Sequence, residues 1–471
     1  MKKLSILICS ALVLASCKKT IDEIRPSDVF QEENAFQTVA DLDKGAIGAY
    51  AAVSGENIIY VAAIMSDEVR ISSENRGQGQ FLHKWTHISS DADAGRAWQN
   101  LYVGIDRANR VLAAIDRVPA NTSAEQAERD VIKGEMLALR GWSHFELWRW
   151  YAKMPYDPNA LGVPYMKVST ISQPERETSA SNFANIEADL TQAKALIPAS
   201  YTGSNLGVSG GLGIGRITRL AVSAMQARAA LYKQDWANAI TYATECIAAV
   251  PLSPRASFAG IWSDANNNEV IWKLKRTTQA VSTLWRDTNG DIFFQPSDKL
   301  RYAYDSTADI RFSTYIKVSH PGLSGDPDDT VTVNKYPGTA SAAFTNDIKM
   351  FRVAEMYLIR AEAKAETNDL VGSANDVNTL RTARFSPAPA PLVFASKQAA
   401  IDAIYNERFL ELAFEGHRYF DLKRRGLAIQ RAATDSAPEY RSLDPSNILY
   451  LFPIPQREVL ANPNIQQNPG Y

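Results

Sequence analysis

ITRLAVSAMQARAALYKQDWANAITYATECIAAVP, residues 217–251, is the stretch that points most directly to a fold. Small residues recur in it at the offsets where two antiparallel helices of a tetratricopeptide-type hairpin touch: Ala227, Ala230, Ala239 and Ala243. Small side chains at these positions let the paired helices approach closely. Pro251 ends the second helix, because proline cannot continue it. The stretch therefore predicts a helical hairpin.

A second alanine-rich pair, FRVAEMYLIRAEAKAETNDLVGSANDVNTLRTAR, occupies residues 351–384, with a turn near Asn368 and Asp369. Helical spacing of apolar residues also prevails from Asp41 to about Arg255. A long helix there starts at a predicted capping box, Ser123 with Gln126. Helix pairs at both ends of the chain predict a mainly α fold, a tetratricopeptide-like superhelix of helical pairs.

The helical pattern fades between residues 255 and 347, where aromatic residues concentrate in short extended runs such as NNNEVIWKLKR and LRYAYD. We therefore divide the chain into helical parts at 41–254 and 348–471 and an irregular insertion with short β-strands at 255–347. Loops carried on a rigid frame are where binding usually resides, so we expect the insertion to bind the ligand. Its candidate stacking residues for sugar rings are Trp262, Trp272, Trp285, Tyr302, Tyr304 and Tyr336. Alternatively, aromatic residues on strands are core residues.

The N-terminus has the pattern of an export signal. Lys2 and Lys3 precede an apolar run, residues 4–14, that is too short to span a membrane, and the run is followed by LASC, which ends at Cys17. The pattern resembles a bacterial lipoprotein signal, in which residues 1–16 are removed and Cys17 carries the lipid. Residues 17–40 are then the lipidated cysteine and a tether. An ordinary signal peptide cleaved nearby would also export the protein.

Composition and motifs argue against several other classes. A formal net charge of −2 and a pI near 6.3 give no basic footprint for nucleic acid. Only His83 and His87 have metal-ligand spacing, and no third ligand lies nearby, so we expect no metal. The glycine-rich run at 202–215 lacks the Gly-Lys-Ser/Thr of a phosphate-binding loop. We expect no cofactor.

NERFLELAFEGHRYFDLKRRG, residues 406–426, holds the strongest candidates for acid catalysis. Offsets of 3, 4 and 3 would place four charged residues on one stripe of a helix: Arg408, Glu411, Glu415 and Arg418. The apolar residues around them predict burial, which requires charges to be paired. An arginine near each glutamate would lower its pKa, whereas a general acid needs a raised one. We therefore interpret the four residues as structural ion pairs.

Several motifs together resemble one known family. LASC at the start, RVAEMYLIRAEAKAE, the 406–426 stretch and the terminal LFPIPQREVLANPNIQQNPGY are similar to hallmarks of the SusD/RagB family of outer-membrane lipoproteins. The resemblance implies a tetratricopeptide-like α fold and a surface lipoprotein of Bacteroidota, lipid-anchored and facing the cell exterior. It also implies a SusC-like TonB-dependent transporter as partner. The lipoprotein would capture a glycan or another nutrient and close over the barrel as a lid, without catalysis.

Two alternatives remain open from the sequence. A surface glycoside hydrolase would need Glu411 or Glu415 as an essential residue. A helical-repeat adaptor that binds only protein would make the insertion aromatics irrelevant to small ligands. The terminal NPNIQQNPGY we interpret as a tail strapped onto the helices, because its prolines favour extended backbone and its amides can bond that backbone.

Overall fold

The computed structural model describes residues 35–204, 213–278, 281–319, 331–339 and 341–471. The predicted signal peptide, residues 1–16, and the predicted lipidation site, Cys17, lie outside the described residues. Within the described ranges, the segment Val39–Met65 is long and apolar enough to cross a membrane by composition alone. Two thirds of it is buried inside the protein, and it is divided into α4 (Val39–Ala52) and α5 (Gly55–Met65), so here it forms part of the core.

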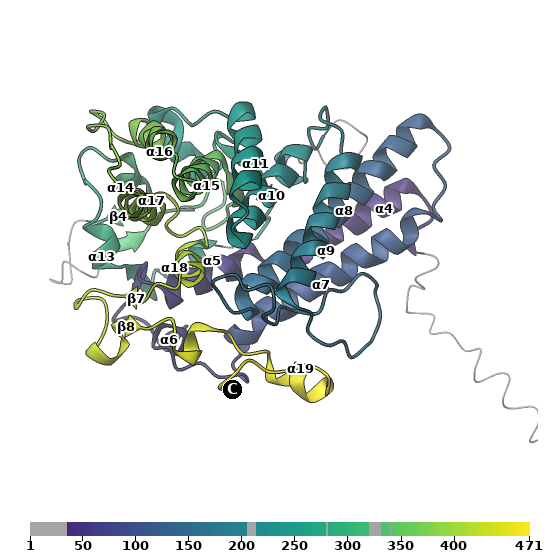
Figure 1. The fold of residues 1–471 in the computed structure, drawn as a ribbon, viewed down its shortest axis with the longest axis horizontal. Coiled ribbons are helices and arrows are strands. Elements are labelled where there is room, and N and C mark those ends of the chain that lie inside the picture. The colour runs from purple at the N-terminus through teal and green to yellow at the C-terminus, as the bar shows by residue number, and fades with distance from the viewer. Residues whose placement is uncertain (1–34, 205–212, 279–280, 320–330, 340) are drawn as a thin grey trace, which may run out of the picture.

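A row of helices forms the frame, and each packs on the next (Figure 1). After α4 the row runs, in chain order, through α7 (Ala92–Ile115), α8 (Ser123–Tyr151), α9 (Ser179–Leu196), α10 (Arg219–Lys233), α11 (Trp236–Ala249), α15 (Val353–Glu366), α16 (Leu370–Arg384) and α17 (Lys397–Glu411). Because α11 packs directly on α15, the frame is continuous although about a hundred residues separate the two helices in the chain. The predicted mainly α fold of helical pairs is confirmed.

The two alanine-rich hairpins form as predicted. Ala227, Ala230, Ala239 and Ala243 are all buried where α10 meets α11. The turn of the second hairpin falls at Asn368, which has a left-handed φ of 68°. The capping box of α8 lies one residue earlier than predicted: Thr122 accepts from Glu125 N, and the Glu125 side chain bonds back to the Thr122 N–H.

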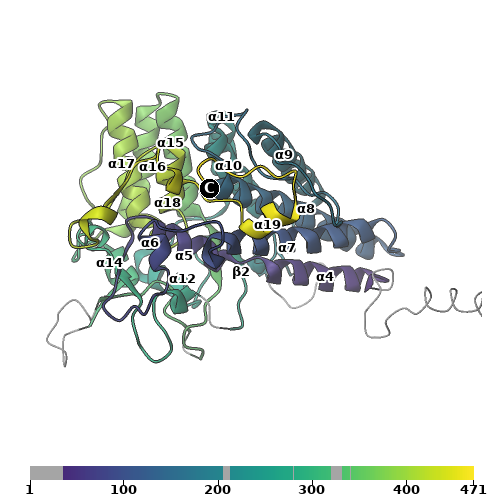
Figure 2. The same ribbon diagram turned by 90° about the horizontal axis from the view of Figure 1, so that it is seen from below.

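Short antiparallel strand pairs connect the insertion to the rest of the chain. β1 (Val69–Ile71) pairs with β3 (Phe294–Pro296), and β2 (Val270–Leu274) pairs with β6 (Ile348–Arg352). Within the insertion, β4 (Ile316–Val318) pairs with β5 (Val331–Val333). Three short helices complete its described part: α12 (Phe258–Trp262), α13 (Asp298–Arg301) and α14 (Ile310–Tyr315). Figure 2 shows this irregular layer beneath the helical frame.

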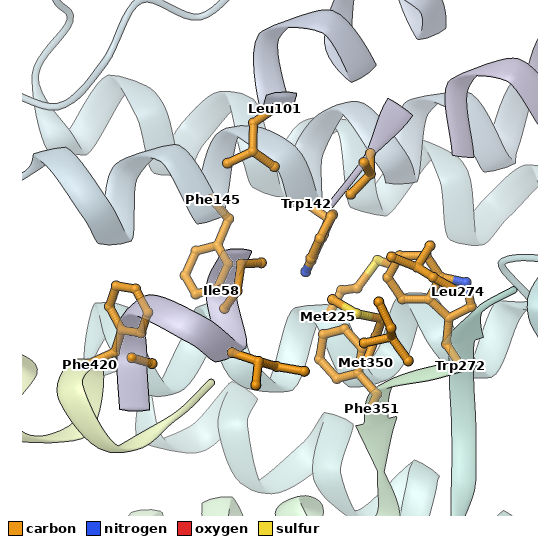
Figure 3. Close-up of a cluster of buried hydrophobic side chains, with 14 of the residues drawn as sticks. Ile58, Leu101, Trp142, Phe145, Met225, Trp272, Leu274, Met350, Phe351 and Phe420 are labelled. Carbon is orange, nitrogen blue, oxygen red and sulfur yellow. The ribbon is translucent and has the colours of Figure 1, made fainter. Parts of the chain in front are cut away.

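One hydrophobic core extends from the frame into the insertion (Figure 3). Trp142 of α8 meets Trp272 of β2 edge to face, with ring centroids 5.3 Å apart, and Trp272 stacks on Phe351 of β6 at 6.2 Å. Fully burying such a side chain contributes about 1.5–3 kcal/mol. The insertion is therefore packed onto the frame by its own aromatic residues.

The chain after α17 returns across the molecule. It forms α18 (Arg418–Arg424), the short pair β7 (Ile429–Gln430) and β8 (Ser442–Leu443), and α19 (Gln456–Ala461), which lies over α7 (Figure 2). α6 (Gln80–His83) lies on the same lower side in Figure 1. This returning segment forms the walls of the cavities described below.

Candidate functional site

The acidic stretch at 406–426 is not one continuous helix. α17 ends at Glu411 and α18 begins at Arg418. Between them Phe414 has a φ of 60° and Gly416 a φ of 85°, which a helix cannot accommodate. The predicted stripe of four charges on one helix face is therefore wrong, and the glycine at 416 is the signal that marks the break.

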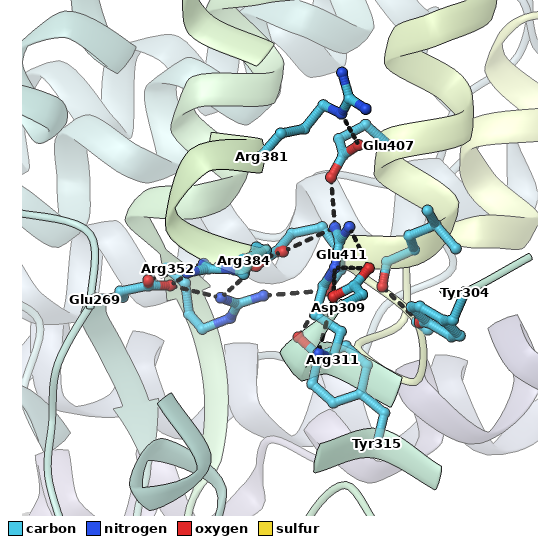
Figure 4. A network of polar contacts seen from close by, with 12 residues as sticks. Glu269, Tyr304, Asp309, Arg311, Tyr315, Arg352, Arg381, Arg384, Glu407 and Glu411 are labelled. Atoms are coloured by element: carbon cyan, nitrogen blue, oxygen red, sulfur yellow. Dashed lines mark hydrogen bonds and ion pairs between the residues drawn. The ribbon is translucent and has the colours of Figure 1, made fainter. Parts of the chain in front are cut away.

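All four charged residues are in ion pairs, Arg408 with Asp421 of the same stretch and the other three with partners from elsewhere in the chain. Figure 4 shows the contacts of Glu411. Glu411 accepts hydrogen bonds from Arg384 at 2.9 Å, Arg352 at 3.1 Å and Arg311 at 3.3 Å. Glu415 accepts from Arg352 at 2.6 Å and Lys335 at 2.7 Å. The network thus joins the insertion, β6, α16 and α17.

Arg408 and Arg418, the two arginines among these four charged residues, make bidentate pairs. Arg408 donates to Asp421 at 2.8 and 2.9 Å, and Arg418 donates to Asp67, 351 positions away in the chain, at 2.7 and 2.9 Å. Planar guanidinium–carboxylate pairs of this kind fix geometry as well as charge. They hold α18 against α17 and against the segment after α5.

The electrostatics of the network do not suit proton transfer. Burial alone would raise the pKa of Glu411, but the charges of Arg384 and Arg352 outweigh it and hold the pKa well below its usual range. The pKa of Glu415 is also lowered, since Arg352 and Lys335 outweigh the effect of burial. Both carboxylates therefore stay ionised as acceptors for cations. A carboxylate in this state does not serve as a general acid.

Glu68 differs from these acids because its pKa is raised and not lowered. Nothing in the neighbouring sequence indicates this. Burial and the neighbouring Asp67 raise the pKa of Glu68 to about 8. Its Oε2 accepts from the Phe414 N–H at 3.4 Å, and its Oε1 has no partner. The side chain is 1% exposed and lines none of the cavities found among the described residues, so no substrate reaches it.

Of the six aromatic residues predicted to stack on a ligand, five are buried and one is exposed. Five belong to the core and are at most 6% exposed: Trp262, Trp272, Trp285, Tyr304 and Tyr336. Trp262, for example, meets Tyr336 edge to face at 5.1 Å. These five rings have no face open to a ligand in this structure. Tyr302 is the exception, at 72% exposed, with the Arg301 guanidinium over its ring.

A large hollow on the described surface lies over α7 instead. Two adjoining cavities, of about 550 and 320 Å³, share the lining residues Trp98, Gln99 and Glu458 and form one groove. The floor is the α7 face that carries Tyr102, which is half-buried, and Trp98, which is 4% exposed and packs against it with ring centroids 4.8 Å apart. A concave site of this size, with aromatic rings and a few polar groups, is typical of a small-ligand site.

The opposite wall of the groove is the C-terminal tail, residues 452–471, which we call the strap. Asn462 donates to the Pro174 carbonyl at 2.8 Å, and Asn464 donates to the Gln173 carbonyl at 2.9 Å. Gln173 in turn donates to the Ala461 carbonyl at 2.9 Å. These side-chain amides attach the strap to the loop at 164–174, and the predicted strapping of NPNIQQNPGY onto the helices is confirmed.

The groove presents polar groups that the protein itself leaves available. Within the described part of the chain, Gln99, Arg457 and Glu458 form no side-chain hydrogen bond or salt bridge. An amide, a guanidinium and a carboxylate together can donate to and accept from hydroxyl groups. In the sequence this helix stands out only as part of the apolar helical spacing between Asp41 and Arg255, although Trp98 and Tyr102, four residues apart, fall on one helix face.

The two histidines with metal-ligand spacing, His83 and His87, contact different residues. Arg431 donates to the ring of His83 at 3.5 Å, and His87 stacks on Phe452 with ring centroids 5.0 Å apart. Burial lowers the pKa of His87 to about 4. Among the described residues, no group of three or more metal-ligating side chains comes together.

Comparison with known proteins agrees with this fold. A family model described as "SusD family" matches residues 328–471, and a second, described as "Starch-binding associating with outer membrane", matches residues 21–231. SusD-like protein P25 of Formosa agariphila is 22% identical over 97% of each chain, and SusD-like protein P2 of the same organism is 24% identical over the full length of both.

Solved structures show the same architecture. A SusD superfamily protein of Bacteroides thetaiotaomicron is 23% identical, covers 92% of this chain and all of its own, and gives a TM-score of 0.80. A putative sugar-binding protein of Bacteroides vulgatus is also 23% identical, covers 93% of this chain and 99% of its own, and gives a TM-score of 0.78. With two family models that together span most of its length, the chain belongs to the SusD/RagB family.

Proposed function

We propose that this protein is a non-catalytic, carbohydrate-binding lipoprotein of the outer membrane that captures an oligosaccharide in the groove over α7. The observation that carries the proposal is the groove itself. The half-buried Tyr102, backed by the buried Trp98, provides its aromatic surface, and the available groups of Gln99 and Glu458 line it. Aromatic faces and mixed donors and acceptors are the chemistry that binds sugar rings and hydroxyls.

Membership in a family with a model described as starch-binding and associating with the outer membrane supports the same reading. The bound sugar would be delivered to a SusC-like TonB-dependent transporter, with the protein acting as the lid of the barrel. Acylation of Cys17 would hold the protein on the outer membrane, facing the cell exterior. Isolation of the native protein from detergent-solubilised membranes should therefore recover a large barrel protein with it.

Binding is tested with the full-length protein in detergent against a panel of neutral oligosaccharides, by isothermal titration calorimetry. We expect one or more of them to bind and to be recovered without cleavage. The double variant Gln99→Ala with Glu458→Gln should weaken binding about tenfold, the effect of losing about 1.4 kcal/mol of interaction. The matched control is Gln430→Ala, an exposed glutamine on β7 outside the groove.

Three outcomes would count against the proposal. Release of a cleaved sugar would favour the glycoside hydrolase. Its catalytic acid would then have to be another residue, because the side chains of Glu411 and Glu415 are buried in ion pairs. Unchanged affinity in the groove variant would move the sugar site elsewhere, with the exposed Tyr302 as the next candidate. Binding of the barrel but of no sugar would favour the adaptor that binds only protein.

A further inference from the structure

A third cavity lies on the other side of the strap. It has a volume of about 450 Å³ and is bounded by the segment that follows α8, by Lys423 of α18, by the loop at 445–451 and by strap residues 466, 468 and 469. It shares no lining residue with the groove over α7. The two hollows are therefore separate sites, with strap residues in the wall of each.

The charges around this third cavity are of one sign. Lys153 and Lys423 line it, and none of its described lining residues is an aspartate or glutamate. Lys153 is exposed, and its ammonium group has no partner among the described residues. The nearest acid along the chain, Asp444, precedes the lining loop and accepts from the Ser446 N–H and hydroxyl at 2.9 and 2.6 Å. Both bonds occupy its Oδ1, and the residue is exposed to solvent.

Lys423 is the buried cation of the cavity, at 4% exposed. Its Nζ donates to the carbonyls of Arg149 and Trp150, at 2.8 and 3.0 Å, in the last turn of α8. In its charged form the amino group of Lys423 has three N–H donors, so these two bonds leave one for a ligand. Burial and the positive charge of Arg149 lower the pKa of Lys423, and an anion in the cavity would favour its charged form.

The remaining residues that line the cavity offer both apolar surface and free amide groups, which together can contact a sugar ring. Met154 and Ile448 contribute apolar surface, and Ile448 is 46% exposed. The amide of Gln466 has no side-chain partner among the described residues. Asn447 uses its Oδ1 to accept from Leu449 N at 3.0 Å, which leaves its NH₂ group available. Aliphatic surface can cover the C–H face of a sugar, and the amides can bond its hydroxyls.

We propose that this cavity is a second ligand site, specific for an acidic saccharide whose carboxylate or sulfate lies between Lys153 and Lys423. The groove over α7, with acids and bases both in its lining, has no such preference for an anion. A protein with both sites would hold a neutral part and an acidic part of a glycan on the two sides of one strap.

The proposal is tested by titrating the full-length protein in detergent with trigalacturonate, with a sulfated disaccharide and with neutral maltotriose, by calorimetry. We expect wild type to bind at least one of the two anionic probes. Lys153→Gln should weaken that binding about tenfold and Lys153→Glu should abolish it, because the second change places a negative charge beside the ligand. The affinity should also fall with added salt. Which anionic probe binds distinguishes carboxylate from sulfate.

Lys317→Gln is the matched control, since Lys317 is an exposed lysine on β4 outside every cavity described here. Failure of both anionic probes to bind wild type, or equal binding by Lys153→Gln and Lys317→Gln, would overturn the proposal. Maltotriose, as the neutral probe, reports on the groove over α7, whereas the anionic probes report on the third cavity. If the Gln99→Ala, Glu458→Gln variant loses a neutral sugar but keeps the anionic probe, the groove and this cavity act independently, and failure of either one leaves the other standing.

Discussion

Glu411→Gln tests whether the acidic stretch at 406–426 holds the fold together or performs chemistry. The substitution keeps the size of the side chain and removes its charge. In the folded protein, Glu411 is 0% exposed and accepts hydrogen bonds from Arg384, Arg352 and Arg311. The amide can still accept with its oxygen, but its NH₂ group would face donors that cannot accept a hydrogen bond.

The expected loss of stability depends on which acidic partners each arginine retains in the variant. Arg311 retains Asp309 and Glu407, and Arg352 retains Glu269 and Glu415, whereas Arg384 retains only Glu269. Figure 4 draws Glu411 with the three arginines and with Asp309, Glu407 and Glu269. Removing one partner of a buried pair destabilises by about 3–5 kcal/mol, and because these partners remain, Glu411→Gln should cost about 3 kcal/mol, at the lower end of that range.

Calorimetry of the wild type and the variant measures this loss. Unfolding entropy for a chain of this length is on the order of 1 kcal/mol per K, so the melting temperature should fall by about 3 °C. The exposed Glu439, changed to Gln, is the control, and its effect should stay within about 0.5 kcal/mol. A melting temperature unchanged in Glu411→Gln, together with loss of a glycan-cleaving activity, would refute the structural reading and establish a catalytic carboxylate.

Trp272→Ala should destabilise by about 3–5 kcal/mol, because its ring is fully buried, while Tyr302→Ala should change stability by less than about 0.5 kcal/mol. Asn468→Ala should lower the unfolding free energy by about 1–3 kcal/mol and open the strap to protease, because its amide bonds two carbonyls and Arg176. Glu68→Gln should leave the melting temperature at pH 4 unchanged and raise it at pH 8.5. The reason is that the folded protein retains a proton up to a pKa of about 8, whereas the unfolded chain releases it near 4.5, so wild-type stability falls as pH rises through that window.

The helical frame was predictable because its signals are local. The contact alanines of α10 and α11 and the turn at Asn368 fall within single hairpins, and spacing along the chain shows them directly. The family motifs carried the same information. The capping box was displaced by one residue because Thr122–Glu125 and Ser123–Gln126 both fit its pattern, and only backbone geometry distinguishes them.

The ligand surface was not predictable in the same way. The strands β2 and β6 are buried at every position, so both of their faces are covered and alternation does not separate core from surface. The sequence around Trp272 is therefore compatible with a residue that stacks on a ligand, but in the structure Trp272 is a core residue. The groove and the third cavity join segments that lie hundreds of positions apart, and no spacing rule connects Gln99 with Glu458.

The strap explains why the strongest sequence motif of the chain is not its ligand motif. Amides within NPNIQQNPGY are used on the protein itself: Asn462 and Asn464 bond the 173–174 backbone, and Asn468 bonds the carbonyls of Tyr151 and Phe452. Side chains committed in this way fix the position of a wall and are unavailable to a sugar. Gln466 is the exception, since it lines the third cavity and its amide has no side-chain partner among the described residues. The other groups proposed to face a ligand, such as Gln99 and Lys153, lie outside the motif and form no side-chain hydrogen bond or salt bridge within the described chain. Changes at those positions alter what is bound without disturbing the frame, so one architecture can hold chemically different glycans.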